Sequence, residues 1–243
     1  MARLSALAST TARTSATLAV ACVLAACGAT TSSKNVRTAG LVALIDITSE
    51  RPDQTVVSAD MVVGGRHSNT HVVLEDGDQL VATCEGEKLE MASVDNGSYA
   101  TRFARSDGEF VVGLERASDK PAPRSVGHMP ASFEITSMFG DTPMSRANDA
   151  LTITWSPGGT DSVVSIELEG DCIHSTVLDA GHDPGTFTIE PGKVTAWKRQ
   201  EKDSCNVALR VVQTKHGEPD PALGEDSSVV LRQIRATRFV SAP

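Results

Sequence analysis

Hydrophobic and polar residues alternate in short runs along most of the chain from Leu41 onward. One run places Val57, Ala59, Met61 and Val63 on the same face of an extended segment. A period of two is typical of a β-strand with one buried face, because successive side chains point to opposite faces. Gly, Asp, Asn, Ser and Pro stand between the runs and favour turns. Further alternating runs contain Leu151, Ile153 and Trp155, and Val164, Ile166 and Leu168.

No long window keeps a helical apolar period with caps at both ends, so the pattern predicts an all-β fold with few, short helices. Residues 99–103 and 110–114 alternate in the same way, with Ser-Asp-Gly at 106–108 between them. Gly108 supplies the positive φ that a tight turn needs. The two runs are therefore expected to form a β-hairpin.

The domain organisation follows from a proline-rich stretch that lacks an apolar period. Pro121, Pro123 and Pro130 fall in this stretch and favour a boundary between two units. Each unit is long enough for a compact sandwich. The expected organisation is a first β-sandwich over residues 41–118, a linker over 119–130 and a second β-sandwich over 131–243.

A short motif occurs once in each expected unit. Residues 95–99 read Asp-Asn-Gly-Ser-Tyr and residues 183–187 read Asp-Pro-Gly-Thr-Phe. The pattern resembles the corner of immunoglobulin-like sandwiches, where the tyrosine hydroxyl bonds to upstream backbone. The resemblance implies two tandem immunoglobulin-like β-sandwich domains. The chain departs from that family where Phe187 replaces the tyrosine, and where Thr101 and Ile189 replace the expected cysteine.

The N-terminus has the layout of a secretory signal. Arg3 and Arg13 supply positive charge, and residues 16–26 form an apolar run that ends in small side chains. The run is shorter than the roughly 20 apolar residues that span a bilayer, so the segment is expected to be cleaved. Residues 24–27 read Leu-Ala-Ala-Cys, which resembles the lipobox of bacterial lipoproteins, with Cys27 as the lipidated residue.

The lipoprotein resemblance implies where in the cell the protein is located. The signal peptide over residues 1–26 would be removed, an acyl lipid on Cys27 would anchor the chain, and residues 27–40, small and polar, would form a flexible tether. Gly28 after the cysteine resembles lipoproteins sorted to the outer membrane, facing the periplasm or the exterior. Ordinary secretion with Cys27 buried or lost is the alternative.

The chain is acidic. It has 22 Lys and Arg against 31 Asp and Glu, a formal net charge of -9. Removal of residues 1–26, which include Arg3 and Arg13, leaves 20 minus 31, about -11. Because phosphate binding needs clustered basic residues, nucleic acid is not expected as a partner.

Cysteine usage fits an oxidising compartment. Cys205 alternates in phase with Val207, and Cys172 has the parity of Leu168, so both are expected to point into one core. A Cys172–Cys205 disulfide closes a loop of about 33 residues and stabilises the second unit by about 3 to 4 kcal/mol. Cys84 is left as a single buried thiol.

No nucleophile elbow, phosphate loop, dinucleotide fingerprint or His-Glu-x-x-His motif occurs, and no cofactor is expected. The candidate metal ligands are His67, His71, Asp76 and Asp78. On an extended strand the two histidines lie about 13 Å apart, too far for one zinc ion unless a turn brings them together. Glu75, Asp76 and Asp78 also offer oxygen ligands to calcium, although Asp-Gly-Asp reads primarily as a turn.

Two further features have a chemical and a structural interpretation. His182 beside Asp183 offers an imidazole–carboxylate base, but Asp183 is also the first residue of the corner motif. Arg232, Arg235 and Arg238 offer a patch for phosphate or an acidic partner, but a charged edge strand that blocks unwanted pairing explains the same residues and is the favoured interpretation.

The favoured function is therefore a lipid-anchored cell-envelope protein that is not an enzyme and has a binding or structural role. Its expected partners are the membrane, through the lipid, and an envelope protein or polysaccharide. The alternative is a metal-dependent or carbohydrate-active hydrolase, whose site would be assembled from His67, His71, Asp76 and Asp78 on loops of the first unit.

Overall fold

The computed structural model describes residues 29–140 and 142–243, and these are almost entirely β-structure. The all-β prediction is confirmed. The two short helices, η1 (Ser33–Asn35) and η2 (Thr38–Gly40), are 3-10 turns, and no helix in the described ranges is long and apolar enough to cross a membrane. The strands are β1 (Ala29–Ser32), β2 (Leu41–Arg51), β3 (Gln54–Val63), β4 (Thr70–Val73), β5 (Gln79–Cys84), β6 (Glu87–Glu90), β7 (Ala92–Asp95), β8 (Ser98–Phe103), β9 (Glu109–Glu115), β10 (Ala122–His128), β11 (Glu134–Ile135), β12 (Met144–Ser145), β13 (Leu151–Ser156), β14 (Val163–Gly170), β15 (Thr176–His182), β16 (Thr186–Ile189), β17 (Cys205–His216) and β18 (Ser228–Ala242).

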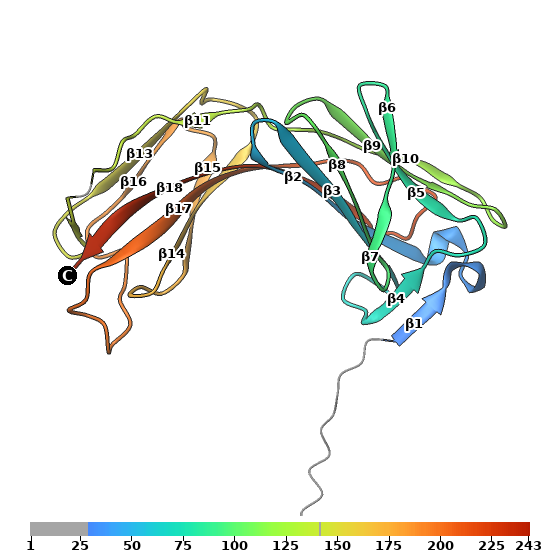
Figure 1. Ribbon diagram of the computed structural model, residues 1–243, viewed down its shortest axis with the longest axis horizontal. Helices are drawn as coiled ribbons and strands as arrows, with labels where there is room; N and C mark the ends of the chain where they lie inside the picture. Colours follow the sequence, from blue (N-terminus) through green and yellow to red (C-terminus); the bar gives the residue numbers. More distant parts are fainter. Residues whose placement is uncertain (1–28, 141) are drawn as a thin grey trace, which may run out of the picture.

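One large sheet runs through both ends of the molecule. It has eleven strands, with the main order β1-β4-β3-β2-β18-β17-β14-β15. Strands β8, β7 and β12 join it at the side. The sheet forms the underside of an arch, and two smaller sheets cover its outer face at the two ends (Figure 1).

The first sandwich is formed where the sheet β10-β9-β5-β6 packs against β2, β3 and β8. Phe103 of β8 and Phe110 of β9 meet edge to face across this core, with ring centroids 5.4 Å apart. The Tyr99 hydroxyl accepts a hydrogen bond of 2.7 Å from the Leu74 backbone N–H. This is the corner bond that the motif at residues 95–99 predicts.

The hairpin predicted from residues 99–103 and 110–114 is wrong. These runs form β8 and β9, but β8 pairs with β3 and β7, whereas β9 pairs with β5 and β10. Gly108 does adopt a positive φ of 104°. The turn therefore carries the chain from one sheet to the facing one, and the two apolar faces meet across the core instead of side by side.

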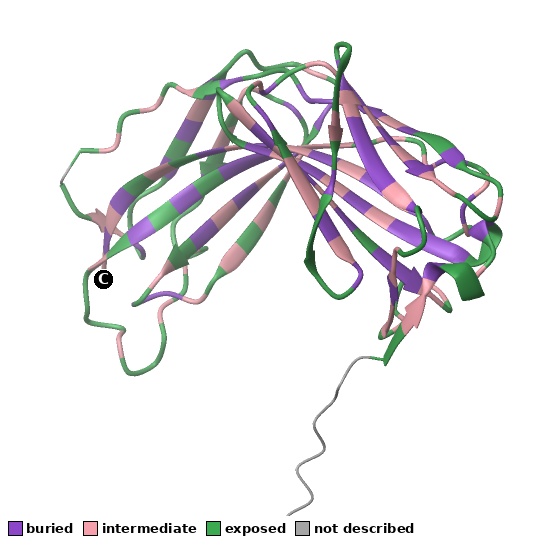
Figure 2. Cartoon of the chain, turned by 45° about the vertical axis from the view of Figure 1, so that its right-hand side comes forward, coloured by how far each residue is buried: buried purple, intermediate pink, exposed green. Residues whose placement is uncertain are grey.

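The second sandwich packs the sheet β11-β13-β16 against β14, β17 and β18. The predicted alternation of β13 and β14 is confirmed, with one buried face on each strand. Buried and exposed residues alternate along the long strands in Figure 2. The main core side chains are Phe133, Leu151, Ile153, Trp155, Val164, Ile166, Leu168, Ile173, Val207, Leu209, Val211 and Phe239.

Strand β18 belongs to both sandwiches. Val229 and Leu231, in its first half, lie in the first core, and Phe239, in its second half, lies in the second. The strand pairs with β17 along its length, and its first half also pairs in parallel with β2. Arg232 does not lie on an edge strand, because β18 pairs there with both β17 and β2. Residues 234–240, which include Arg235 and Arg238, pair with β17 alone.

Arg235 occupies the place on β18 between the two cores. Its guanidinium lies 5.5 Å from the ring centroid of Phe133 and donates hydrogen bonds to the Ser132 hydroxyl (3.0 Å) and the Ser49 carbonyl (3.3 Å). Burial lowers the pKa of this arginine, while Glu134 opposes the shift. Arg235 thus fills the junction of the sandwiches as an internal polar contact and is not part of a surface patch.

The segment expected as a linker contains strand β10. Residues 122–128 pair with β9, with a register shift between Ala122 and Ser125, both of which are buried. Pro123 falls inside this irregularity, where the missing N–H costs no ladder bond. The prolines therefore mark a bulged strand of the first sandwich. The expected boundary also fails at β18, which lies within residues 131–243 but contributes to the first core.

The segment expected as a flexible tether is folded over its described part, residues 29–40. Strand β1 pairs in parallel with β4, and Ser33 and Thr38 are buried. The Asp119 carboxylate accepts hydrogen bonds from the Thr38 N–H (2.7 Å) and hydroxyl (3.1 Å). The hydrogen bond from the Thr38 backbone N–H also holds the pKa of the Asp119 carboxyl below its ordinary value. Polar contacts fix this segment, which explains why it has no apolar period.

Arg116 is the centre of this attachment. Its side chain and that of Asp78 are almost completely buried, and Arg116 Nε lies 2.7 Å from Asp78 Oδ2. The guanidinium also donates to the backbone carbonyls of Ser33 (2.9 Å) and Val36 (3.1 Å) and to the Thr38 hydroxyl (3.2 Å). One buried ion pair therefore ties the N-terminal segment to the first sandwich.

Replacing Arg116 with methionine is expected to destabilise the protein by about 3 to 5 kcal/mol, because Asp78 becomes an unpaired buried charge. The N-terminal segment should also detach, so that trypsin cuts faster after Lys34 and Arg37, whose side chains are already exposed but whose backbone is held in the folded protein. Urea unfolding and the rate of tryptic cleavage measure the two effects. Arg124→Met, which removes an exposed ion pair with Glu109, is the control and should change stability by less than about 1 kcal/mol. Equal resistance of both variants to trypsin would contradict the role of Arg116.

Candidate functional site

The predicted metal ligands are not gathered into a site. Asp78 is buried against Arg116, Asp76 lies 3.4 Å from Lys34 Nζ on the surface, and His67 is exposed. His71 lies on β4, opposite Val62 of β3. Within residues 29–140 and 142–243, no group of three or more His, Cys, Asp or Glu side chains has an arrangement that could hold a metal ion.

The carboxylate of Asp183 is used to build the second sandwich. It is 4% exposed and accepts hydrogen bonds from Trp155 Nε1 (2.7 Å), the Thr160 hydroxyl (2.7 Å) and the Gly185 N–H (3.1 Å). Burial alone raises the pKa of Asp183, but the bonds from Thr160 and Trp155 bring it below its ordinary value. Its lone pairs are occupied, which favours the corner role over that of a base for His182.

A charged cleft of about 390 Å³ lies where β9 and β10 approach the end of β17. Several of its ionisable side chains form pairs: His128 Nε2 lies 2.9 Å from Glu109 Oε2, and Lys215 pairs with Asp161. His216 and Glu218 also line the cleft. Such exposed pairs are ordinary surface ion pairs. These exposed pairs do not single the cleft out as a catalytic site.

A different feature stands out at the far end of the second sandwich. Trp197 is 48% exposed in the Trp197 loop (residues 196–204), which precedes β17. Its ring lies against that of His174, with centroids 3.8 Å apart. The two rings line an open hollow of about 620 Å³ together with Lys198, Arg199 and Gln200. An exposed tryptophan held in a fixed position is typical of a binding anchor.

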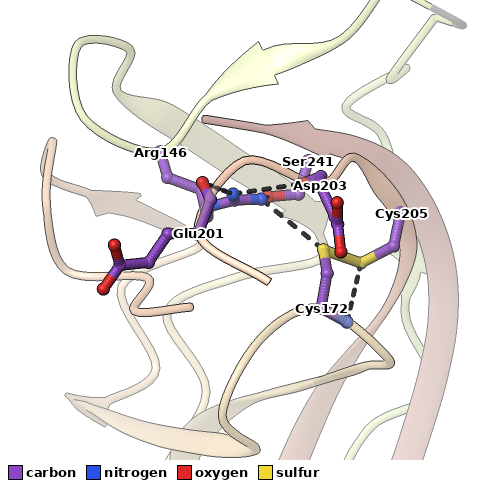
Figure 3. Close-up of a disulfide and its surroundings, with 6 residues drawn as sticks. All are labelled: Arg146, Cys172, Glu201, Asp203, Cys205 and Ser241. Carbon is purple, nitrogen blue, oxygen red and sulfur yellow. Dashed lines mark hydrogen bonds between the residues drawn. A yellow bond between two sulfur atoms is a disulfide. The ribbon is translucent and has the colours of Figure 1, made fainter. Parts of the chain in front are cut away.

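The base of the loop is fixed by the Cys172–Cys205 disulfide (Figure 3), with Cα atoms 5.8 Å apart. The predicted pairing is confirmed, and Cys84 is a buried free cysteine, as expected. The disulfide joins the end of β14 to the start of β17. It therefore holds the two ends from which His174 and the Trp197 loop extend.

Arg146 holds the loop from inside. This buried side chain donates hydrogen bonds to the carbonyls of Glu201 and Asp203 (3.0 Å each), to the Ser241 hydroxyl (3.2 Å) and to Cys172 Sγ (3.5 Å) (Figure 3). A guanidinium has several donors in a fixed plane, which suits it to join separate backbone segments. Arg146 thus links the loop, the disulfide and the end of β18.

Backbone bonds complete the loop. The Gln200 N–H donates to the Trp197 carbonyl (2.7 Å), the Asp203 N–H donates to the Gln200 carbonyl (3.0 Å), and the His174 N–H donates to the Thr195 carbonyl (2.9 Å). Consecutive turns of this kind keep a polar segment in one conformation. Trp197 is therefore exposed on a loop that is held in one conformation.

Sequence reasoning missed Trp197, His174 and Arg146. The signal for Trp197 was present, because a lone tryptophan stands in the otherwise polar run Ala-Trp-Lys-Arg-Gln-Glu-Lys-Asp-Ser that leads to Cys205. No alternation places such a residue in a core. The partners of Arg146 come from distant segments, so no local pattern could reveal it.

Comparison with known proteins identifies no family. No family model and no curated protein matches this chain. Solved structures that resemble it include a chain of a cytokine receptor complex (10% identity, 82% of this chain and 94% of that chain covered, TM-score 0.29). Others are the Clostridium thermocellum CbhA fibronectin(III)-like modules (9%, 83% and 93%, 0.27) and the chicken CNTN1 FN1-FN3 domains (7%, 82% and 66%, 0.28). Scores this low carry no argument, so the functional assignment rests on the site.

Replacing Arg146 with methionine should loosen the Trp197 loop, because the carbonyls of Glu201 and Asp203 lose their charged donor. We expect a loss of about 2 to 3 kcal/mol in the free energy of unfolding and faster amide exchange across residues 196–204. Hydrogen-exchange mass spectrometry and urea unfolding measure both. Lys202→Met, an exposed change in the same loop, is the control. Unchanged exchange in the arginine variant would show that the loop does not depend on Arg146.

Asp183→Asn should destabilise the protein by about 2 to 3 kcal/mol at neutral pH, because hydrogen bonds to a charged acceptor are lost. Since the folded pKa of Asp183 lies below the unfolded value of about 3.9, its contribution is present above about pH 4 and is lost as pH falls through the folded pKa. The stability difference from the parent should therefore shrink in urea unfolding below pH 4. Asp171→Asn, an exposed change, is the control, and a difference independent of pH would contradict the assignment.

Proposed function

We propose that this chain is a cell-envelope protein, anchored by a lipid on Cys27, that binds another envelope component through the Trp197 loop and has no catalytic role. The observation that carries the proposal is the exposed Trp197 ring, held against His174 on a loop that the disulfide and Arg146 fix. The lipid anchor rests on the lipobox alone, because Cys27 lies outside the described residues.

A tryptophan side chain that is fixed before binding has an energetic advantage at an interface. Binding orders the groups at an interface, and each flexible side chain costs about 0.5 to 1.5 kcal/mol to immobilise. A tryptophan that is already fixed avoids most of that cost and still has a large apolar surface to bury. The bracing of the Trp197 loop thus supports recognition by a preformed surface.

The short distance in sequence between Cys27 and strand β1 supports a position of the first sandwich close to the membrane. Strand β1 begins at Ala29, so only Gly28 separates the folded first sandwich from Cys27. The loop that precedes β17 lies at the other end of the arch, on the same side as β1 (Figure 1). A lipid on Cys27 would hold the first sandwich at the bilayer, with the Trp197 loop at the far end of the arch.

The test is mild crosslinking of the membrane-anchored protein, followed by affinity recovery and mass spectrometry. We expect a specific envelope partner that is recovered with the parent chain and reduced about tenfold or more by Trp197→Ala, because interface tryptophans dominate binding. Cys27→Ser tests the anchor and should move the protein from the membrane to the soluble fraction.

Val94→Ala is the matched control, because Val94 is an exposed apolar residue on β7 of the other sandwich. Its partners should be those of the parent chain. Equal recovery of all partners from the parent and the Trp197 variant would reject the loop as the binding site. Membrane retention of the Cys27 variant would reject the lipid anchor.

A further inference from the structure

The hollow beside Trp197 combines one apolar platform with several polar groups. Lys198, Arg199 and Gln200 line it together with the rings of His174 and Trp197, whose planes are inclined at 45°. A sugar ring has a flat face of C–H groups, which packs on an aromatic ring because the face of an aromatic ring carries partial negative charge. The hydroxyl groups at the rim of a sugar need donors and acceptors such as the Gln200 amide.

The charge next to the platform is positive. Lys198 and Arg199 adjoin Trp197 in a chain whose formal net charge is -9. The Trp197 loop also contains Lys202, Glu201 and Asp203, so its three basic and two acidic residues leave one net positive charge. Arginine and lysine form charge-assisted hydrogen bonds with carboxylate, sulfate or phosphate groups. The loop therefore favours an acidic ligand in a molecule that otherwise repels one.

A second hollow continues from the first. It has a volume of about 300 Å³, and its charged lining residues are Arg210 and the two carboxylates Glu167 and Glu169. Ser175 and Thr176, which follow His174 in the chain, also line it. Strand β15 is the last strand of the large sheet, so the path along it is open to solvent. Glu167 and Glu169 outnumber Arg210, so this second hollow does not favour acidic groups. Because the first hollow is open, a chain bound at Trp197 can extend beyond it into solvent.

We propose that the Trp197 loop binds an acidic polysaccharide. One sugar ring stacks on Trp197, and its acidic group pairs with Lys198 and Arg199. This inference rests on the proposed function, in which the same loop is the binding surface, and it names the class of the ligand.

The test uses acrylamide quenching of tryptophan fluorescence in the purified Cys27→Ser chain. The chain has two tryptophans, and Trp155 is 3% exposed, so the quencher reports mainly on Trp197. The probes are polygalacturonate, dextran sulfate and neutral dextran. We expect the two acidic polymers to protect Trp197 from quenching, with protection that weakens as salt is raised, and neutral dextran to have little effect.

Variants separate the platform from the charges when binding is measured by calorimetry. Trp197→Ala should lower affinity for polygalacturonate about tenfold or more, and Lys198→Gln with Arg199→Gln should lower it several-fold and flatten its salt dependence. Lys202→Gln is the matched control, because Lys202 lies in the same loop but does not line the hollow. A loss of affinity as large for Lys202→Gln as for the double variant would show a non-specific charge effect and overturn the site.

Other outcomes overturn the inference in distinct ways. Absence of protection by both acidic polymers rejects a polysaccharide ligand, and equal protection by neutral dextran rejects the acidic class. If no polymer binds but a crosslinked protein partner still depends on Trp197, the ligand class fails and the proposed function stands. If neither a polymer nor a protein partner depends on Trp197, both proposals fail.

Discussion

The antiparallel ladder between β17 and β18 is the interaction on which the rest of the structure depends. It runs without a register shift from Cys205 opposite Ser241 to His216 opposite Val230. Because side chains alternate with a period of two, an unbroken ladder keeps one face of both strands turned to the same side along its length. Its ends lie in different cores, with Leu231 in the first and Phe239 in the second. The two sandwiches are therefore joined by shared hydrogen bonds and not by a linker.

Buried polar groups join further segments that are distant in the sequence. Arg116 attaches the N-terminal segment, Arg235 fills the junction on β18, and Asp183 closes a corner of the second core. Each is costly to bury alone and stable only when its partners are in place. Their partners come from segments far away in the sequence. They also explain how polar stretches become ordered without an apolar face.

The Trp197 loop is a surface segment that is fixed in the same way, by a buried polar side chain. Arg146 and the disulfide hold its base, and the tip presents an aromatic pair with basic neighbours. The fold contributes rigidity and the loop contributes chemistry, a division common among β-sandwiches. The charged cleft near His128 lacks this arrangement, because no tryptophan, tyrosine or phenylalanine lines it.

The sequence by itself determined which face of strands such as β13 and β14 lies inward and that Cys172 pairs with Cys205, because both follow from parity. The corner at Tyr99 was expected from the resemblance of residues 95–99 to immunoglobulin-like sandwiches. Tertiary structure decided which strands pair. Alternation is the same for a hairpin as for two strands in facing sheets, so it did not distinguish β8 and β9 from a hairpin. Tertiary structure also decided whether the polar segments are ordered. Whether a polar stretch is a tether, a linker or a braced loop depends on distant partners such as Arg116 and Arg146, and no local pattern contains them.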